Sequence, residues 1–125
     1  MIVLDASAWV DVLAGQGDDA LLRHDELVVP PHFDVEVLAS VRSLAQRRVI
    51  SDGAADRAKD RHLRAPFTRT FDPADAIAAW ELREAMSFRD AWYAALARRL
   101  QVPWITADGK AAGVAERLGV QVRLI

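Results

Sequence analysis

The stretch Ile2-Val3-Leu4-Asp5-Ala6, at the start of the chain, decides the fold that we expect. Its first residues form a short, wholly apolar run, which is typical of a strand buried on both faces of a parallel sheet. An acid, Asp5, follows this run, and a carboxylate at the end of a buried strand is costly without partners. We therefore expect a strand over Ile2–Ala6 whose carboxyl end carries a functional group.

The rest of the chain alternates between short apolar runs and helical patterns. Further strands are expected at Leu27–Val29, Phe67–Phe71, Val102–Thr106 and Val120–Leu124. Helices are expected at Ser7–Ala14, Asp18–His24, Phe33–Arg48, Ala54–Leu63, Pro73–Ala85, Phe88–Leu100 and Lys110–Leu118. This alternation predicts a single domain over residues 1–125, built as a three-layer α/β/α sandwich around a parallel sheet.

Composition excludes several classes of protein. The 125 residues are 52% hydrophobic and 27% charged, which excludes a disordered chain. The lack of cysteine excludes disulfides, thiolate metal sites and a cysteine nucleophile. No apolar run approaches the roughly 20 residues of a membrane helix, and the N-terminal residues do not resemble an export signal. We therefore expect a cytoplasmic protein that does not contact membranes.

Four acids stand where the expected fold brings strand ends and helix starts together. Asp5 and Asp108 follow two strands at the carboxyl edge, where open α/β sheets bind ligands. Glu36 and Asp90 lie in helices among apolar neighbours. Converging carboxylates repel one another unless a cation joins them, and a site rich in Asp and Glu suits Mg²⁺ or Mn²⁺.

Two hydroxyl residues accompany these acids. Ser7 and Thr106 lie two residues from Asp5 and Asp108, where they could hydrogen-bond a carboxylate or a metal-bound water. The three histidines are scattered along the chain and indicate no acyl-transfer site. Other acids, such as Asp34 and Asp75, are interpreted as ordinary surface or capping residues.

A basic stretch separates the first acids from the last. From Arg42 to Arg69 there are eight basic residues and three acids, although the net charge of the whole chain is −2. Such a cluster can follow a phosphate backbone, or it can be a solvated helix face with Asp–Arg pairs. The residues expected to flank the acids and hold backbone phosphates are Arg42, Arg47, Arg48, Arg57, Arg61 and Arg64.

The order and spacing of four segments carry a family resemblance. These segments are LDASAWV, the helical glutamate in PPHFDVEVL, DAWYAALA and ITADGK. Together they resemble a PIN domain of the VapC type, a toxin ribonuclease from bacterial toxin–antitoxin pairs. The resemblance covers essentially the whole chain and implies five parallel strands in the order 3-2-1-4-5.

The resemblance also implies an activity and its residues. The family's acidic quartet falls on Asp5, Glu36, Asp90 and Asp108, with Ser7 and Thr106 as supporting polar residues. It implies a Mg²⁺- or Mn²⁺-dependent endoribonuclease in which a metal-activated water attacks the phosphodiester, leaving a 5′-phosphate. Tyr93, a common aromatic of the third segment, is interpreted as a packing residue. The segment after Asp108 offers no further acid.

Partners follow from the same resemblance. It implies a homodimer and a small VapB-type antitoxin. We expect this antitoxin to silence the site by placing an Arg or Lys against the acids, where its charge would replace that of the metal. We expect Trp9 and Leu13 to hold the antitoxin, because a short first helix cannot bury every apolar side chain that it carries.

Two other readings remain open. A phospho-receiver-like domain would also place acids at strand ends, but it needs an acidic pair after the first strand, where Asp5 stands alone. A haloacid-dehalogenase-type phosphatase would need a second acid where Ser7 stands. A catalytically silent binding module could keep the fold, although the intact quartet argues against it.

Overall fold

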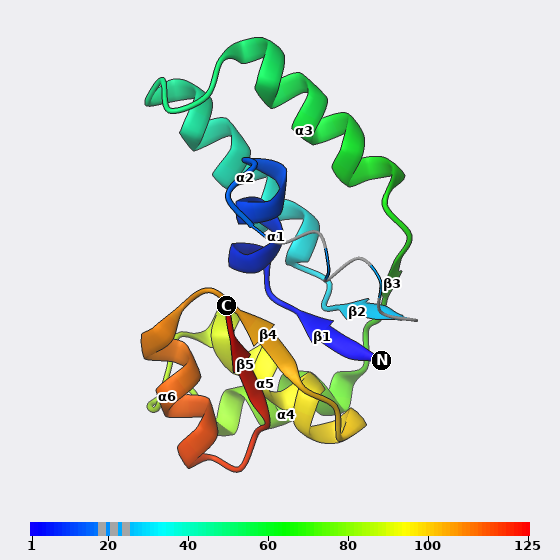
Figure 1. Ribbon diagram of the computed structural model, residues 1–125. Helices are drawn as coiled ribbons and strands as arrows, with labels where there is room; N and C mark the ends of the chain where they lie inside the picture. The colour runs from blue at the N-terminus through cyan, green and yellow to red at the C-terminus, as the bar shows by residue number, and fades with distance from the viewer. Residues whose placement is uncertain (18–19, 21–22, 24–25) are drawn as a thin grey trace.

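The computed structural model describes residues 1–17, 20, 23 and 26–125, and its centre is one parallel sheet of five strands (Figure 1). The strands lie in the order β3-β2-β1-β4-β5, as the family resemblance implies. Their bounds are β1 Ile2–Leu4, β2 Leu27–Val29, β3 Phe67–Arg69, β4 Trp104–Thr106 and β5 Val122–Leu124. Because β1 is the middle strand, the residue that follows it lies at the centre of the carboxyl edge.

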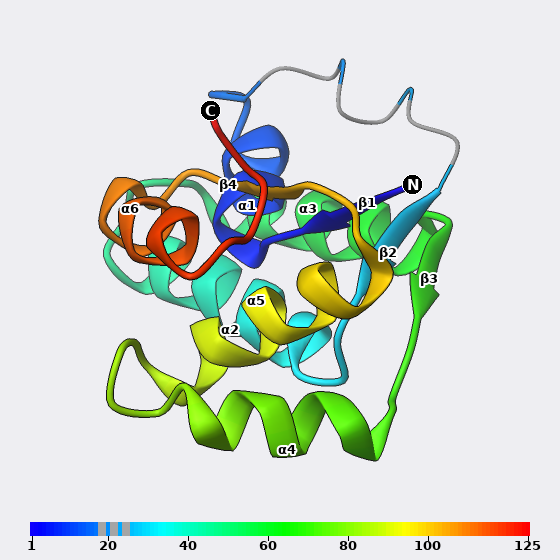
Figure 2. The same cartoon turned by 90° about the horizontal axis from the view of Figure 1, so that it is seen from below.

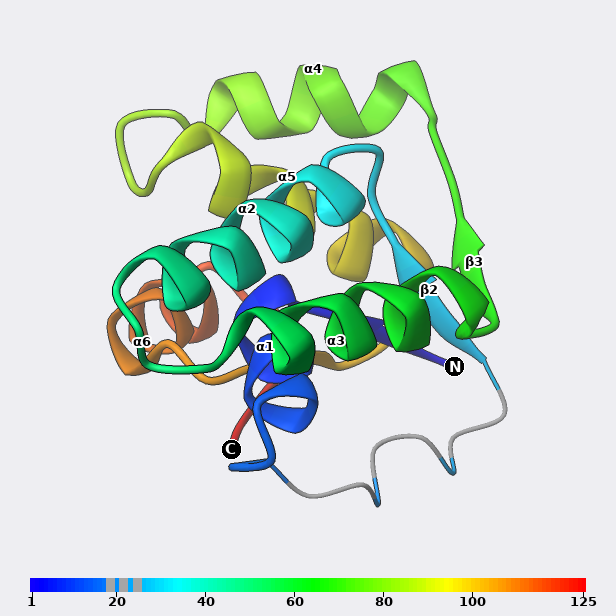
Figure 3. The same ribbon diagram turned by 90° about the horizontal axis from the view of Figure 1, so that it is seen from above.

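Helices cover both faces of this sheet. They are α1 Ala6–Leu13, α2 Phe33–Gln46, α3 Asp52–Arg64, α4 Pro73–Glu81, α5 Phe88–Leu100 and α6 Gly109–Arg117. Helices α1, α2 and α3 pack on one another, while α4 packs on α5. Figure 2 shows α1 and α5 on opposite sides of β1 and β4, with α4 outside α5. Figure 1 shows α2 and α3 extending away from the sheet, and the view from above shows α4 as the outermost layer (Figure 3).

The expected elements are present, with shifted ends. Each strand is three residues long, so those expected over five residues are shorter than the sequence predicts. Helix α4 ends at Glu81 rather than at Ala85, because the chain turns there before Ser87 caps α5. The helix expected over Asp18–His24 falls mostly on residues outside those described. Among the described residues, no helix is both long enough and apolar enough to span a membrane.

Aromatic side chains fill the core on both sides of the central strands. Val3 pairs with Val28 on one side and with Trp104 on the other, and β1 is fully buried. Tyr93 of α5 stacks on Trp104 with its ring centroid 5.9 Å away. On the other helical layer, Trp9 of α1 packs edge-on against Phe67 of β3. This double coverage explains why the first strand is apolar at every position.

Trp9 belongs to the core, so its expected role at the antitoxin interface is wrong. Its side chain is 1% exposed, and its indole N–H donates to Nδ1 of His62 at 3.0 Å. Because that nitrogen accepts, the other ring nitrogen of His62 carries the proton and donates to Asp34 at 2.7 Å. Asp34 in turn accepts two hydrogen bonds from Arg69. Leu13, by contrast, is only partly buried and packs at the edge of the core.

Two acids expected at the surface also serve the fold. The Arg69 guanidinium lowers the pKa of Asp34, so this carboxylate stays ionised within the network that joins α2, α3 and β3. Asp75 of α4 is 1% exposed and accepts two hydrogen bonds from Arg99 of α5, at 2.6 and 2.9 Å. Sequence position alone could not reveal these partners, because each lies more than 20 residues away along the chain.

We predict that His62→Leu destabilises the fold by about 2 kcal/mol, because it leaves the buried indole N–H of Trp9 without an acceptor. Urea unfolding followed by circular dichroism would measure the loss. Leu63→Ala is the control, since Leu63 is exposed on the same helix and its change should stay within about 0.5 kcal/mol. Equal stability of the two variants would contradict a structural role for the His62 network.

Candidate active site at the carboxyl edge of the sheet

Asp5 occupies the centre of the site. It is the N-cap residue of α1 and is 5% exposed, and its backbone N–H donates to Ile105 of β4. One carboxylate oxygen accepts hydrogen bonds from both Ser7, at 2.8 Å, and Thr106, at 2.5 Å. The two hydroxyls that the sequence indicated therefore converge on a single oxygen atom of Asp5, which fixes the orientation of this carboxylate.

Glu36 enters the site from the first turns of α2. Its Oε1 accepts a hydrogen bond of 2.9 Å from the hydroxyl of Tyr93, whose own ring is fully buried. Tyr93 is therefore more than the packing residue expected from the sequence, since it also positions an acid. The pKa of Tyr93 is raised by burial and by the neighbouring carboxylates, so its hydroxyl stays protonated and donates.

Asp90 and Asp108 come from the starts of α5 and α6. The backbone N–H of Asp90 donates to Ser87, the N-cap residue of α5. Asp108 is itself the N-cap residue of α6, and its Oδ1 accepts from the backbone N–H groups of Lys110 and Ala111. Both acids line a groove of about 490 Å³ between the α4–α5 turn and α6. The four acids thus come from four different helix starts.

His32 is a member of the site that the sequence interpretation missed. Its Nε2 lies 3.3 Å from Oε1 of Glu36 and 3.1 Å from the backbone oxygen of Arg89. Its ring contacts the rings of Trp92 and Tyr93. Burial lowers the pKa of His32, which favours a neutral ring. A histidine four residues before a helical acid is a signal that could have identified it.

The electrostatics of these acids show that the site carries excess negative charge. Burial raises the pKa of Asp5 to about 6, although its two hydroxyl donors act in the opposite direction, and the charges of Asp90 and Glu36 raise it further. Burial likewise raises the pKa of Glu36 and of Asp90, and Asp108 adds repulsion at Asp90. A cation placed among these groups would offset both the cost of burying the carboxylates and their mutual repulsion.

The donor set fits a hard divalent cation in its chemistry. It consists of carboxylate oxygens with hydroxyls behind them, which are the ligands that Mg²⁺ and Mn²⁺ prefer. Over residues 1–17, 20, 23 and 26–125, no three Asp, Glu or His side chains are grouped tightly enough to hold one ion between them. Mg²⁺ usually keeps several waters and takes only one or two carboxylates as direct ligands, so a tight group of three acids is not needed for binding.

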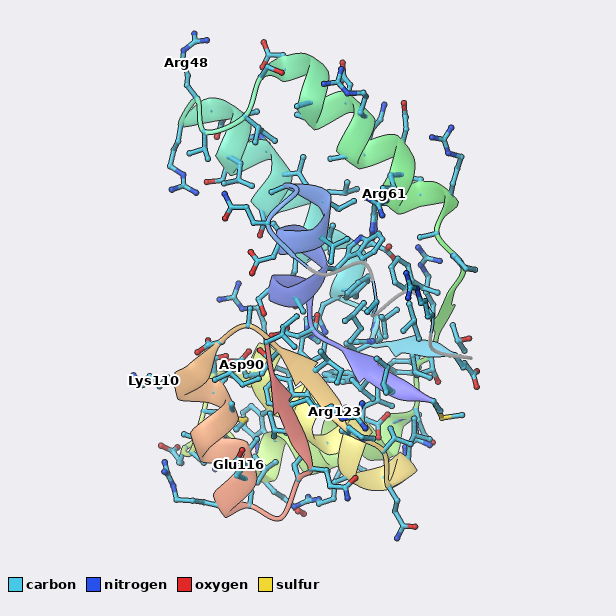
Figure 4. The ribbon with its side chains drawn as sticks, viewed as in Figure 1. Arg48, Arg61, Asp90, Lys110, Glu116 and Arg123 are labelled. Carbon is cyan, nitrogen blue, oxygen red and sulfur yellow. The ribbon has the colours of Figure 1, made fainter. Side chains whose placement is uncertain are left out.

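Two of the arginines expected to flank the acids lie away from Asp90. Arg48 lies beyond the end of α2 and Arg61 lies over α1, both away from Asp90 (Figure 4). Arg61 covers the ring of Trp9, with its guanidinium carbon 5.6 Å from the ring centroid. The other members of the expected set are exposed on α2, on α3 or just after α2: Arg42, Arg47, Arg57 and Arg64. Figure 1 shows the α2–α3 hairpin, which carries these residues, extending away from the sheet.

Comparisons with known proteins agree with this geometry. The model of the PIN domain family matches residues 2–117. Ribonuclease VapC12 of Mycobacterium tuberculosis is 38% identical over 116 residues, which cover 90% of each chain. The VapC ribonuclease Mb0985 of Mycobacterium bovis is 39% identical over 111 residues, with 86% of each chain covered.

Solved structures show the same fold. PAE2754 from Pyrobaculum aerophilum has a TM-score of 0.74 at 22% identity, covering 97% of this chain and 82% of its own. VapC20 of Mycobacterium tuberculosis, a toxin that cleaves the sarcin–ricin loop, has a TM-score of 0.62 at 20% identity, covering 90% of this chain and 94% of its own. From the family match and these relatives, the chain belongs to the PIN domain family and groups with its VapC ribonucleases.

Proposed function

We propose that this protein is the toxin of a toxin–antitoxin pair and cleaves RNA as a metal-dependent endoribonuclease, acting as a single domain in the cytosol. The observation that carries the proposal is the convergence of four acids from separate helix starts on the carboxyl edge of the sheet. The VapC relatives support it, because they share the fold and cover 86% or more of this chain. A phospho-receiver and a silent binding module receive no such support.

The proposed roles divide the site between orientation and ligation. Asp5, Glu36, Asp90 and Asp108 would hold one or more Mg²⁺ or Mn²⁺ ions. A bound ion of this kind neutralises phosphate oxygens and acidifies a water molecule. Ser7 and Thr106 keep one oxygen of Asp5 occupied by hydrogen bonds, so its other oxygen would be the one available to hold a metal ion. Tyr93 does the same for Glu36.

We further propose two protein partners on different faces. A groove of about 380 Å³ between α1 and the end of α2 would take a segment of the antitoxin; its lining mixes apolar residues such as Val10, Leu44 and Ile50 with polar ones such as Asp11 and Arg47. Leu13 lies on the same helix as Val10, at the edge of the core. Exposed Ile77 and Trp80 on α4, together with Phe71 and Phe88, form an apolar face that a second copy of the chain would cover.

Neutralising any one acid of the quartet should reduce RNA cleavage by about 100-fold or more, because each change removes a charged ligand. The variants are Asp5→Asn, Glu36→Gln, Asp90→Asn and Asp108→Asn. Incubation with total RNA and ligation-based counting of new 5′-phosphate ends would measure activity with Mg²⁺ or with EDTA.

Glu116→Gln and Asp56→Asn are the matched controls, since both residues are exposed, Glu116 near the C-terminal end of α6 and Asp56 on α3. Each control should keep the activity of the wild type. Full activity in EDTA, or products that end in a 2′,3′-cyclic phosphate, would contradict metal-dependent hydrolysis.

Asp5→Asn should stabilise the metal-free protein at pH 8 by about 2 kcal/mol. The pKa of Asp5 is about 6 in the folded chain against an ordinary value of 3.8, so the folded state loses stability as the pH rises from 4 to 6. The asparagine variant lacks this loss, and its advantage should vanish below pH 4. Thermal unfolding in EDTA would measure the stability difference between the variant and the wild type. Equal stability at pH 8 would contradict the claim that ionising the buried Asp5 destabilises the fold.

Leu44→Glu and Leu13→Ala should weaken antitoxin binding at least several-fold, because each removes apolar contact along the α1–α2 face. Copurification with the product of a neighbouring small gene would measure this. Leu63→Ala, on the outer side of α3, should bind like the wild type. Retention by both test variants would place the antitoxin on another surface.

A further inference from the structure

The groove that contains Asp90 and Asp108 continues past these acids to two cations. Its lining includes Arg83 from the α4–α5 turn, Met86 and Ser87 before α5, and Lys110 from the second position of α6. Figure 4 shows Lys110 and Asp90 on neighbouring elements at this edge of the molecule. Acidic and basic side chains therefore share one continuous groove.

Arg83 is held in place by its neighbours while its charge remains accessible. Its Nη1 donates to the backbone oxygen of Trp80 at 2.9 Å, and its guanidinium carbon lies 4.6 Å from the centroid of the Trp80 ring. The nearest oxygen of Glu84 is 3.8 Å from Nε, and the Glu84 side chain is 91% exposed, so this ion pair is weak. A guanidinium fixed against a ring loses little freedom when it binds a phosphate.

Lys110 offers its charge from the opposite side of the groove. It follows Gly109 at the start of α6, and its backbone N–H is used in the cap formed by Asp108. Its side chain is exposed and lines the groove. This hydrogen bond fixes the backbone of Lys110 next to Asp108, so the lysine side chain starts from a fixed point beside that acid.

An RNA substrate would meet a difficulty at this site that these cations address. Each phosphate next to the scissile one carries a negative charge and is repelled by carboxylates that the bound metal does not fully neutralise. Cations beside the acids offset that repulsion and fix the register of the strand. The basic residues of the α2–α3 hairpin could not do so at close range, since Arg48 and Arg61 lie away from Asp90 (Figure 4).

We propose that this groove is a phosphate subsite for single-stranded RNA, in which Arg83 and Lys110 hold the backbone phosphate adjacent to the one that is cleaved. The inference rests on the proposed function and specifies where the substrate runs. The RNA chain leaves the acidic site between the α4–α5 turn and α6, rather than along α3.

A binding experiment with a fluorescein-labelled, mixed-sequence single-stranded RNA tests this subsite. Anisotropy in Ca²⁺, which permits binding without rapid turnover, would give Kd for the wild type, Arg83→Ala and Lys110→Ala at 50 to 200 mM salt. Each variant should bind about 5-fold more weakly, and its salt slope should fall by about 0.7 for the lost phosphate contact. Cleavage in Mg²⁺ should show a raised KM with kcat within about 3-fold.

Three further variants test whether the effect depends on the positive charge itself and on its position in the groove. Arg83→Lys keeps the charge and should recover most of the affinity. Arg98→Ala and Arg123→Ala remove exposed cations from the far end of α5 and from β5, and should leave Kd and the salt slope unchanged. A melting temperature close to that of the wild type would confirm that each variant is folded.

The outcomes distinguish the two proposals. If the wild type cleaves RNA but Arg83→Ala and Lys110→Ala bind it as tightly as the two controls do, the subsite is overturned and the proposed function stands. If Arg57→Ala and Arg64→Ala lose affinity instead, the strand runs along α3. A wild type that neither binds nor cleaves RNA would reject both proposals.

Discussion

The site is organised around one buried carboxylate at the end of the central strand. Asp5 is 5% exposed and held by two hydroxyls, one from its own helix and one from the neighbouring strand. Burial of an acid without a cation costs stability, and the other acids add repulsion. The fold tolerates this cost because the strands and helices around Asp5 form a densely packed core. Because the backbone around Asp5 is packed in this core, a cation can bind the destabilised carboxylate with little backbone rearrangement.

The second feature of the molecule is the separation of its charges. The α2–α3 hairpin carries many of the arginines, but it extends away from the sheet (Figure 1). Some of its charged and polar residues serve the fold instead, as His62 does between Trp9 and Asp34. The cations that line the groove with Asp90 and Asp108 come from sequence positions that formed no basic cluster, since Arg83 stands between Glu81 and Glu84 and Lys110 stands among small residues. Clustering along the chain is therefore a poor guide to clustering in space here.

The difference between neighbours along the chain and neighbours in space explains how far the sequence could predict this structure. The five strands and their order followed from apolar runs, alternation and the family resemblance, because a parallel sheet leaves strong local patterns. Asp5 and Asp108 could be placed at the carboxyl edge because each follows a strand, whereas Glu36 and Asp90 joined them through the family resemblance. The contributions of His32 and Tyr93 did not follow, since each depends on a contact between α5 and the start of α2. The burial of Trp9 was missed for a similar reason: its polar partner is 53 residues away.

The most direct test of the central claim is to locate the metal. Crystals of the protein soaked in millimolar Mn²⁺ would give an anomalous difference map at the manganese absorption edge. We predict a peak in contact with the Asp5 carboxylate and with at least one of Glu36, Asp90 and Asp108, accompanied by movement of these side chains towards the ion. A map with no peak at Asp5, in crystals that bind Mn²⁺ elsewhere, would contradict the assignment of these acids as the metal-binding centre.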